Sequence, residues 1–401
     1  MAGDLHFRPT FSYKTIVTFT KSHAQGFLCR GSPRGKPFSF DHTKTGFSKL
    51  EAAVSALRGE AGKEPAVAFE HTGVYSRVVA KWAESAGIRQ IAISPLLSAK
   101  ARKSRLRPTK NDSLDCKSIA EAAYGSDVGE ARAPSALLAL SRQREAASSA
   151  AAEAKARYRM RIDLCWPCLD AFADPLSNAA MAAVMHYRHP AAVLRAGPKR
   201  VEAFLRKSAP GLGRISPKAL AAKLCDYARE SMPPVGESSA EVDSLLRAAY
   251  EAKSAMGLEG ELASRLIEEA RKSGGFGILT SIDGVGERLA ASILAEIGDV
   301  SRFPNQGKIA AYAGLDPAVC QSGRSGGLHL RITRKGNAFL RKYLYLAVLG
   351  CCSARRSNRI KEFVDRKQKG GLPRKAALVA GCRKMLLVIR AMLLNGTAFE
   401  H

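Results

Sequence analysis

The order of apolar segments in the first 94 residues constrains the fold more than any other feature of the chain. Three short apolar segments within residues 14–42 are separated by turn-forming residues, which predicts three antiparallel strands. A helical segment at 45–57, the apolar segment PAVAFE at 65–70, a second helical segment at 74–86 and a further apolar segment at 88–94 follow. Strands that alternate with helices in this order predict a mixed α/β domain.

Three acidic residues stand where such a domain could bind metal ions. Glu70 ends the apolar segment 65–70, and Asp112 and Asp115 lie three residues apart in a helix predicted to begin near residue 111. This spacing places both aspartates on one helix face. The order of elements resembles that of ribonuclease H and RuvC-like domains, in which acidic residues gather metal ions. The alternative is that the aspartates only interact with the helix dipole.

The chain is strongly basic. Its 401 residues include 63 Lys and Arg against 36 Asp and Glu, a net charge of +27, which predicts a polyanionic partner and favours nucleic acid over a membrane surface. Residues 100–110 contain six cations and no acid: Lys100, Arg102, Lys103, Arg105, Arg107 and Lys110. We interpret them as a phosphate-binding strip beside the candidate metal ligands, and a solvated helix face is the alternative.

The sequence carries no pattern for membrane insertion or secretion. No uninterrupted apolar run reaches the roughly 20 residues of a spanning helix, and the apolar C-terminal segment is broken by Arg383, Lys384 and Arg390. The N-terminus lacks a signal-peptide pattern, and the nine cysteines are an odd number scattered through the chain. These features predict reduced thiols and a cytoplasmic protein, with no membrane partner.

Two long helices are predicted around a helical insert. The first spans about residues 134–165 and the second about 238–272, which suggests a coiled-coil-like stalk or dimer arm. A Cys-x-x-Cys pair and a His-x-x-His pair fall in or next to the insert: Cys165, Cys168, His186 and His189. Their spacing is poor for a zinc finger, so buried thiols and ordinary histidines are expected.

Residues 278–303 match a helix-hairpin-helix pattern. Gly284 and Gly286 predict a tight hairpin before the helical segment ERLAASILAEI. Backbone amides at the start of that helix can bind a phosphate without reading bases. The alternative is that the glycines simply let two helices pack closely.

The stretch 314–344 contains the favoured nucleophile, Ser322. Glycines around the serine predict a loop, residues 328–332 predict a short strand, and a helix is expected to begin near Ala338. Five cations accompany the serine: Arg324, Arg331, Arg334, Lys335 and Arg341. Such cations suit attack on a phosphodiester, because they stabilise charge that develops on phosphoryl oxygens. No general base is evident except His329, and an ordinary turn serine is the alternative.

Several motifs together resemble those of the transposases of insertion-sequence family one-hundred-and-ten, the bridge-RNA-guided recombinases that also include the pilin-gene invertases. FEHTGVYSRVVAKWAESAG at 69–87 and TKNDSLDCKSIAEAA at 109–123 resemble the family's E-x-T-G-x-Y and K-T-D-x-x-D-A motifs. In the C-terminal half, residues 282–317, the QSG at 321–323 and ITRKGNAFLRKYL at 332–344 resemble its second motif block. The likeness therefore involves both ends of the chain.

The resemblance implies a fold that is α/β plus all-α. It implies an N-terminal RuvC/RNase H-like domain with a DEDD metal site, which we place at 1–130. A helical, coiled-coil-like assembly region at 131–272 and a C-terminal helical transposase domain with the helix-hairpin-helix at 273–401 complete the predicted organisation.

The resemblance also implies a chemistry and partners. Ser322 matches the serine that attacks DNA to form a covalent phosphoserine, and Glu70, Asp112 and Asp115 match three of the four acids that hold Mg²⁺. The implied partners are donor and target duplex DNA, a structured guide (bridge) RNA, and further copies of the chain in a dimer or tetramer.

The first acid of the DEDD set does not match. The family begins with a strand like G-I-D-x-S-K, and here Thr18 occupies the aspartate position. Because a hydroxyl is a weaker ligand than a carboxylate, a magnesium site completed by Thr18, or by a nearby acid such as Asp41, would be weakened. Two hypotheses follow. We favour an active RNA-guided recombinase, because Ser322 and three acids persist, over a repurposed RNA- and DNA-binding relative without strand transfer.

Overall fold

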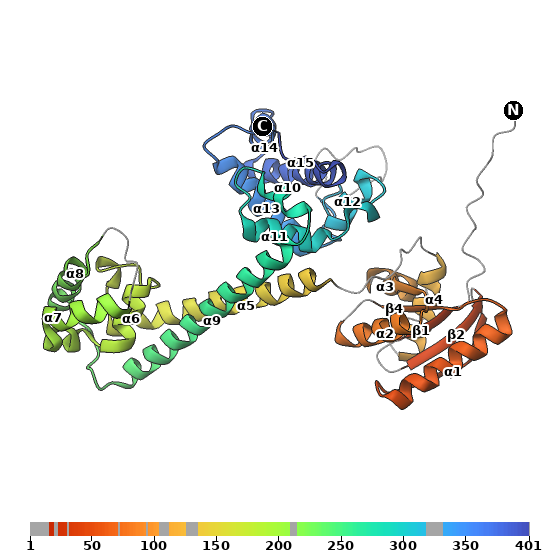
Figure 1. The fold of residues 1–401 in the computed structure, drawn as a ribbon, viewed down its shortest axis with the longest axis horizontal. Coiled ribbons are helices and arrows are strands. Elements are labelled where there is room, and N and C mark those ends of the chain that lie inside the picture. The colour runs from red at the N-terminus through yellow and green to blue at the C-terminus, as the bar shows by residue number, and fades with distance from the viewer. Residues whose placement is uncertain are drawn as a thin grey trace. The chain divides into compact units, whose positions relative to one another are not determined.

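The computed structural model (Figure 1) describes residues 16–19, 23–29, 32–70, 73–93, 95–103, 112–125, 135–208, 215–317 and 332–400. They belong to two compact units, residues 1–134 and 135–401, each with its own hydrophobic core. Several predicted site residues lie outside the described residues: Arg105, Arg107, Lys110, Ser322, Arg324, His329 and Arg331. Within the described residues, no helix is long and apolar enough to cross a membrane.

The first unit contains a five-stranded sheet in the order β3-β2-β1-β4-β5. β1 (Ile16–Phe19), β2 (His23–Cys29) and β3 (Ser32–Ser39) are antiparallel neighbours. β4 (Ala66–Glu70) pairs in parallel with β1 and with β5 (Gln90–Ile93). The predicted antiparallel start and the two later strands are therefore confirmed.

Four helices accompany this sheet: α1 (Lys44–Ala61), α2 (Gly73–Ser85), α3 (Pro95–Lys103) and α4 (Asp112–Gly125). Side chains alternate between the two faces along β4. Val67 and Phe69 pack in one core with residues of α1 and α2, whereas Ala66 and Ala68 pack in another with residues of α4. The face of the sheet that carries Ala68 is therefore the face covered by α4.

The second unit is helical in its described residues and contains the two predicted long helices. α5 (Ala136–Cys165) and α9 (Ala240–Arg271) pack along each other and are named the stalk helices below (Figure 1). They are antiparallel, because the start of α5 and the end of α9 share one core while their opposite ends share another. In the sequence, the insert separates these two helices. It contains η2 (Leu169–Ala171), α6 (Asn178–Tyr187), α7 (Pro190–Ser208) and α8 (Pro217–Glu230).

The C-terminal part of this unit is a helical bundle. It consists of α10 (Gly275–Thr280), α11 (Glu287–Ile297), η3 (Val300–Arg302), α12 (Gln306–Ala313), α13 (Ala338–Ser353), α14 (Arg359–Lys369) and α15 (Arg374–Asn395). Helix α13 packs against α11, α14 and α15, and its residues Leu344 and Ala347 are fully buried in the core of the bundle. This bundle holds the segments on both sides of Ser322.

Candidate functional site

Thr18 and Glu70 lie on the same face of the sheet. Thr18 of β1 pairs with Ala68 of β4, and Glu70 follows Ala68 by two residues on the same strand. Alternate residues of a strand face the same side, so all three face α4. Thr18 is completely buried, and its hydroxyl donates a hydrogen bond to the carbonyl oxygen of Gln25 at 3.4 Å.

Two side chains of helix α3 form hydrogen bonds with the two carboxylates that the structure describes at this face, Glu70 and Asp115. The hydroxyl of Ser98 donates to Oε2 of Glu70 at 2.8 Å. Nη1 of Arg102 donates to Oδ1 of Asp115 on α4 at 3.0 Å, and the Asp115 side chain stays 20% exposed. Arg102, predicted as part of a phosphate-binding strip, is thus the ion-pair partner of a predicted metal ligand. Ser98 was not among the predicted site residues, because a lone serine in a helix carries no sequence signal.

The donor chemistry at this face fits a hard divalent cation. Carboxylate oxygens are the ligands that Mg²⁺ prefers, and Glu70 and Asp115 supply them. Asp112 is the first residue of α4, one turn before Asp115, as the spacing predicts; its side chain lies outside the described residues. Among the described side chains, no group of three His, Cys, Asp or Glu residues is placed to hold a metal ion. The metal-binding role of these residues, and of Thr18, therefore stays a prediction.

The structure describes residues 100–103 of the predicted phosphate-binding strip, and the rest of the strip lies outside the described residues. Lys100 is exposed on α3, whereas the side chain of Lys103 lies outside the described residues. With Arg102 paired to Asp115, Lys100 is the strip residue that the structure shows facing solvent.

The described residues on either side of the Ser322 segment are joined to each other. Pro317 and Ile332 form an antiparallel bridge, and the amide and hydroxyl of Thr333 both donate to Asp316, at 3.0 and 2.6 Å. The predicted strand at 328–332 is described only at Ile332. The two ends of the segment that carries Ser322 are therefore held together at its base.

Helix α13 begins at Ala338, as predicted, and Asn337 is its N-cap, accepting hydrogen bonds from two amides of the first turn. Gly336 has no room for a side chain, because a Cβ there would lie 2.4 Å from the backbone nitrogen of Gly314. Nη1 of Arg341 donates to the carbonyl of Ala313 at 2.8 Å. Burial, followed by the nearby charge of Arg334, lowers the pKa of Arg341. Arg341 therefore stabilises the described residues that flank the Ser322 segment, by joining α13 to the end of α12.

Arg334 and Lys335 remain exposed at the C-terminal end of the Ser322 segment. Arg334 adopts a left-handed conformation with φ of 52°, which is uncommon for a residue with a side chain. Of the five cations predicted to accompany Ser322, these two are the ones that the described residues show to be exposed.

The glycines of the helix-hairpin-helix pattern have different surroundings. Gly284 has φ of +81°, and a Cβ there would lie 2.3 Å from the carbonyl carbon of Gly350 in α13. The close approach of α13 therefore explains why a glycine stands at position 284. Gly286 has open space around it and caps α11 without a side-chain hydrogen bond.

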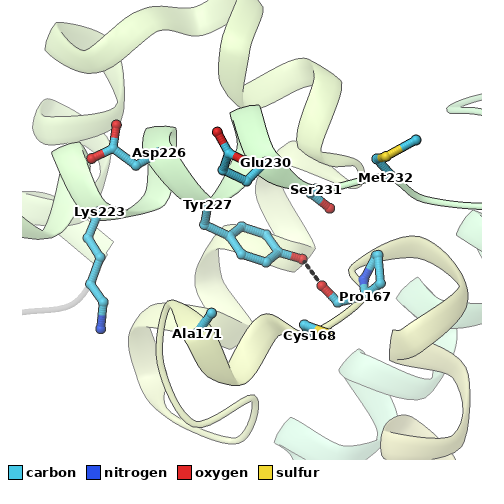
Figure 2. Close-up of a pocket in the computed structure, with 9 residues that line it drawn as sticks. All are labelled: Pro167, Cys168, Ala171, Lys223, Asp226, Tyr227, Glu230, Ser231 and Met232. Carbon is cyan, nitrogen blue, oxygen red and sulfur yellow. Dashed lines mark hydrogen bonds between the residues drawn. The ribbon is translucent and has the colours of Figure 1, made fainter.

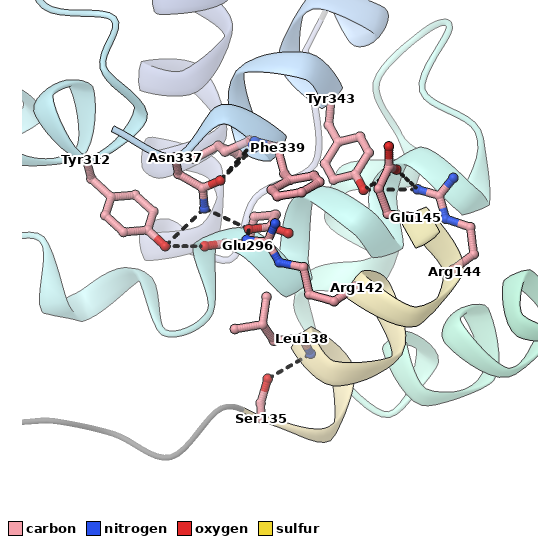
Figure 3. A network of polar contacts seen from close by, with 11 residues as sticks. Ser135, Leu138, Arg142, Arg144, Glu145, Glu296, Tyr312, Asn337, Phe339 and Tyr343 are labelled. Carbon is pink, nitrogen blue, oxygen red and sulfur yellow. Dashed lines mark hydrogen bonds and ion pairs between the residues drawn. The ribbon is translucent and has the colours of Figure 1, made fainter. Parts of the chain in front are cut away.

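A buried polar network joins the stalk helix α5 to the C-terminal bundle, and the sequence analysis did not predict it (Figure 3). Glu296 of α11 is 2% exposed and receives hydrogen bonds from Arg142 at 2.8 Å and from Asn337 at 2.7 Å. Burial raises the pKa of Glu296, against the opposing effects of Asn337 and Arg142. The one available signal was an acid within the otherwise apolar stretch ASILAEI.

Glu145 of α5 occupies the second centre of this network. It accepts hydrogen bonds from Lys342 and from the hydroxyl of Tyr343, the latter at 2.9 Å, and it pairs with Arg144 at 3.2 Å. Burial alone would raise the pKa of Glu145, but the hydrogen bonds from Lys342 and Tyr343 and the neighbouring charges outweigh it, so the pKa is lowered.

The histidines of the possible zinc pattern are engaged in the fold. Nδ1 of His189 accepts from the amide of Ala191 at 3.2 Å, which leaves Nε2 to donate to the carbonyl of Val235 at 3.1 Å. The ring of His186 stacks on Phe204 with centroids 4.1 Å apart. These contacts explain both histidines without a metal.

A pocket of about 480 Å³ lies in the insert region, and none of the predicted catalytic residues lines it (Figure 2). Tyr227 lines it, and the Tyr227 hydroxyl donates to the carbonyl of Pro167 at 2.9 Å. Burial raises the pKa of Tyr227 to about 12. Since the Tyr227 hydroxyl is already used by the fold, the pocket does not replace the sheet face as the candidate site.

Two family models match the chain. The model described as "Transposase IS116/IS110/IS902 family" matches residues 277–365, and a DEDD transposase model of the IS110 group matches residues 21–167. The chain belongs to the IS110/IS116/IS902 family of transposases. In this IS110-family chain, the N-terminal match includes Glu70, Asp112 and Asp115 but begins after Thr18, and the C-terminal match includes Ser322.

Individual relatives agree with this assignment. The chain is 32% identical over 243 residues to "Insertion element IS110 uncharacterized 43.6 kDa protein" of Streptomyces coelicolor, covering 58% of this chain and 56% of the relative. It is 33% identical over 235 residues to "Insertion element IS900 uncharacterized 42 kDa protein" of Mycobacterium paratuberculosis, covering 57% and 56%. The "Pilin gene-inverting protein" of Moraxella bovis is 31% identical over 123 residues, covering 31% and 38%. The matches thus span about half the length of the first two relatives.

Proposed function

We propose that this protein is a DNA recombinase that cuts and rejoins strands through a covalent phosphoserine at Ser322. The serine Oγ attacks a backbone phosphorus, so that an O–P bond forms as one P–O bond of the strand breaks. The serine proton passes to a base or solvent, and the departing strand oxygen takes up a proton. Attack by a strand hydroxyl on the phosphoserine then rejoins the DNA and releases the serine.

The observation that carries this proposal is the placement of Glu70 and Asp115 at one face of a sheet with the order β3-β2-β1-β4-β5, as in the RuvC-like domain that the resemblance implies. Glu70, Asp115 and Asp112 would hold Mg²⁺, which when bound supplies positive charge to phosphoryl oxygens. Ser98 orients the Glu70 carboxylate, and Arg102 offsets the charge of Asp115. In this proposal base pairing with a guide RNA selects the target, so no side chain encodes its sequence.

The test is the formation of a covalent protein–DNA adduct on supercoiled DNA with Mg²⁺. We expect the wild-type protein to form the adduct, and Ser322→Ala to abolish it while nucleic-acid binding persists. Ser325→Ala, three residues further along the same segment, is the matched control and should retain the adduct. An adduct that persists in Ser322→Ala would place the chemistry elsewhere.

The second candidate is an RNA- and DNA-binding relative that has lost strand transfer. The observation that favours it is Thr18, the residue we align with the missing acid, which is uncharged, completely buried and hydrogen-bonded to a backbone carbonyl. The same assay separates the two functions. A wild-type protein that binds both nucleic acids and yields no adduct with Mg²⁺ would establish the binding-only function.

A further inference from the structure

A second helical hairpin in the C-terminal bundle presents an ordered, charged tip. Helices α14 and α15 are joined by a short turn, and we name residues 366–375 the α14–α15 tip. The amide of Gly370 donates to the carbonyl of Arg366 at 3.0 Å, and the amide of Leu372 donates to the carbonyl of Lys367 at 3.1 Å. Gly371 provides the left-handed residue of the turn, with φ of +89°.

The hairpin is fixed to the core of the bundle. Ile360 and Val364 of α14 are buried in it, and a Cβ at Gly381 of α15 would lie 2.8 Å from Val364. The two helices therefore cross in close contact, and the α14–α15 tip is held in a defined position by that crossing.

The α14–α15 tip is purely cationic. Its ten residues, RKQKGGLPRK, contain five cations and no acid: Arg366, Lys367, Lys369, Arg374 and Lys375. All five are exposed, and none forms a salt bridge with a carboxylate among the described residues. Elsewhere in the second unit exposed arginines do pair, as Arg195 does with Glu237.

Stabilisation of helix ends explains only part of this charge. Arg366, Lys367 and Lys369 occupy the last turn of α14, where cations favourably face the negative end of the helix dipole. Arg374 and Lys375 open α15, where the dipole disfavours cations and the first turn contains no acid. Stabilisation of the helix end therefore does not explain Arg374 and Lys375.

The α10–α11 hairpin has the opposite electrostatics. Residues 281–290 carry Asp283 and Glu287 against one cation, Arg288. Glu287 pairs with Arg271 at 2.6 Å and Arg288 pairs with Glu259 at 3.8 Å. The hairpin that the sequence pattern singled out for phosphate binding therefore offers little free positive charge.

We propose that the α14–α15 tip binds the phosphodiester backbone of nucleic acid, with Arg374 and Lys375 as its principal contacts. This inference rests on the proposed function only in that nucleic acid is the partner. Arg366 and Lys367 lie over the ring of Phe363, and Arg374 and Lys375 have no ring or carboxylate partner among the described residues. Cations on such an ordered turn match closely spaced backbone phosphates and read no bases. Duplex DNA and structured RNA share this chemistry and are the two possible sources of the phosphates.

The test compares two variants of the full-length protein with equal loss of charge. The tip variant carries Lys369→Gln, Arg374→Gln and Lys375→Gln. The control variant carries Lys199→Gln, Arg200→Gln and Lys207→Gln, three exposed cations of α7 in the insert. Binding to a short duplex DNA of arbitrary sequence and to a hairpin RNA is measured over a range of salt concentrations, alongside thermal stability.

We expect the tip variant to bind at least one probe about tenfold more weakly and to lower the slope of log K against log salt by about two to three. The melting temperature should stay unchanged or rise, because two cations leave a helix N-terminus. Loss with DNA alone, RNA alone or both identifies the source of the phosphates. Equal affinities and slopes in the tip and control variants would overturn the inference. Failure of the proposed function would appear separately, as a wild-type protein that binds and forms no Ser322 adduct.

Discussion

The carboxylates Glu70 and Asp115 in the first unit and Glu145 and Glu296 in the second lie in different environments. Glu70 and Asp115 are partly exposed, and α3 gives each a hydrogen bond to one oxygen, from Ser98 and Arg102 respectively. Glu145 and Glu296 are 8% and 2% exposed within a network of arginines, a lysine, an asparagine and a tyrosine. All four residues are acids, so the residue type does not distinguish them. Their burial and their hydrogen-bond partners do: Glu145 and Glu296 stabilise the fold, whereas Glu70 and Asp115 stay accessible to a ligand.

The largest effect should follow from removing a charge at the sheet face. Glu70→Gln keeps an oxygen for Ser98 but removes the charge that a divalent cation requires. We expect Mg²⁺-dependent adduct formation to fall by about 100-fold or more while the melting temperature changes little. The exposed Glu84→Gln on α2 is the control and should leave the adduct unaffected. Normal adduct formation by Glu70→Gln would show that Glu70 is not a metal ligand.

The buried network should respond with a loss of stability instead. Glu145→Ala leaves Lys342 and Arg144 without their acid and the Tyr343 hydroxyl without its acceptor. We expect the free energy of unfolding to fall by about 2–3 kcal/mol, measured by chemical denaturation of the full chain. Glu251→Ala on α9 removes an exposed pair with Arg157 and should cost less than about 0.5 kcal/mol. An equal loss of unfolding free energy in Glu145→Ala and Glu251→Ala would show that the buried network stabilises the fold no more than an exposed ion pair does.

The smallest effect is an opposite pH dependence of the two buried glutamates. The pKa of Glu296 is raised in the folded protein, so its ionisation costs stability progressively as pH rises from the unfolded pKa through the raised folded one. The pKa of Glu145 is lowered, so its ionised form stabilises the fold above the unfolded pKa, and this contribution is lost as pH falls through the folded value.

Melting temperatures of Glu296→Gln and Glu145→Gln relative to wild type test this opposition. As pH rises from acid to neutral, the relative stability of Glu296→Gln should improve, whereas that of Glu145→Gln should worsen. Parallel curves for the two variants would contradict the assignment of opposite environments.

Local patterns predicted most of the elements because they depend on neighbouring residues. The continuous apolar segment PAVAFE predicted β4, and Gly336 with Asn337 predicted the start of α13. A helix was expected to begin near residue 111, and α4 begins at Asp112. The motifs that predicted the family are also short and local. Charge composition located cations in the sequence, but it could not tell the paired Arg102 from the unpaired Arg374.

The sequence by itself determined the strands and helices, the family and the candidate catalytic residues, because hydrophobic period, turn residues and motifs are read along the chain. Only the tertiary structure decided what each charged group faces. Lys342 meets Glu145 across 197 residues and Arg142 meets Glu296 across 154, and no local pattern specifies a contact at such separations. The pairing of Arg102 with Asp115, the burial of Thr18 and the exposed cations of the α14–α15 tip follow from packing, because packing decides which charges lose water and which keep it.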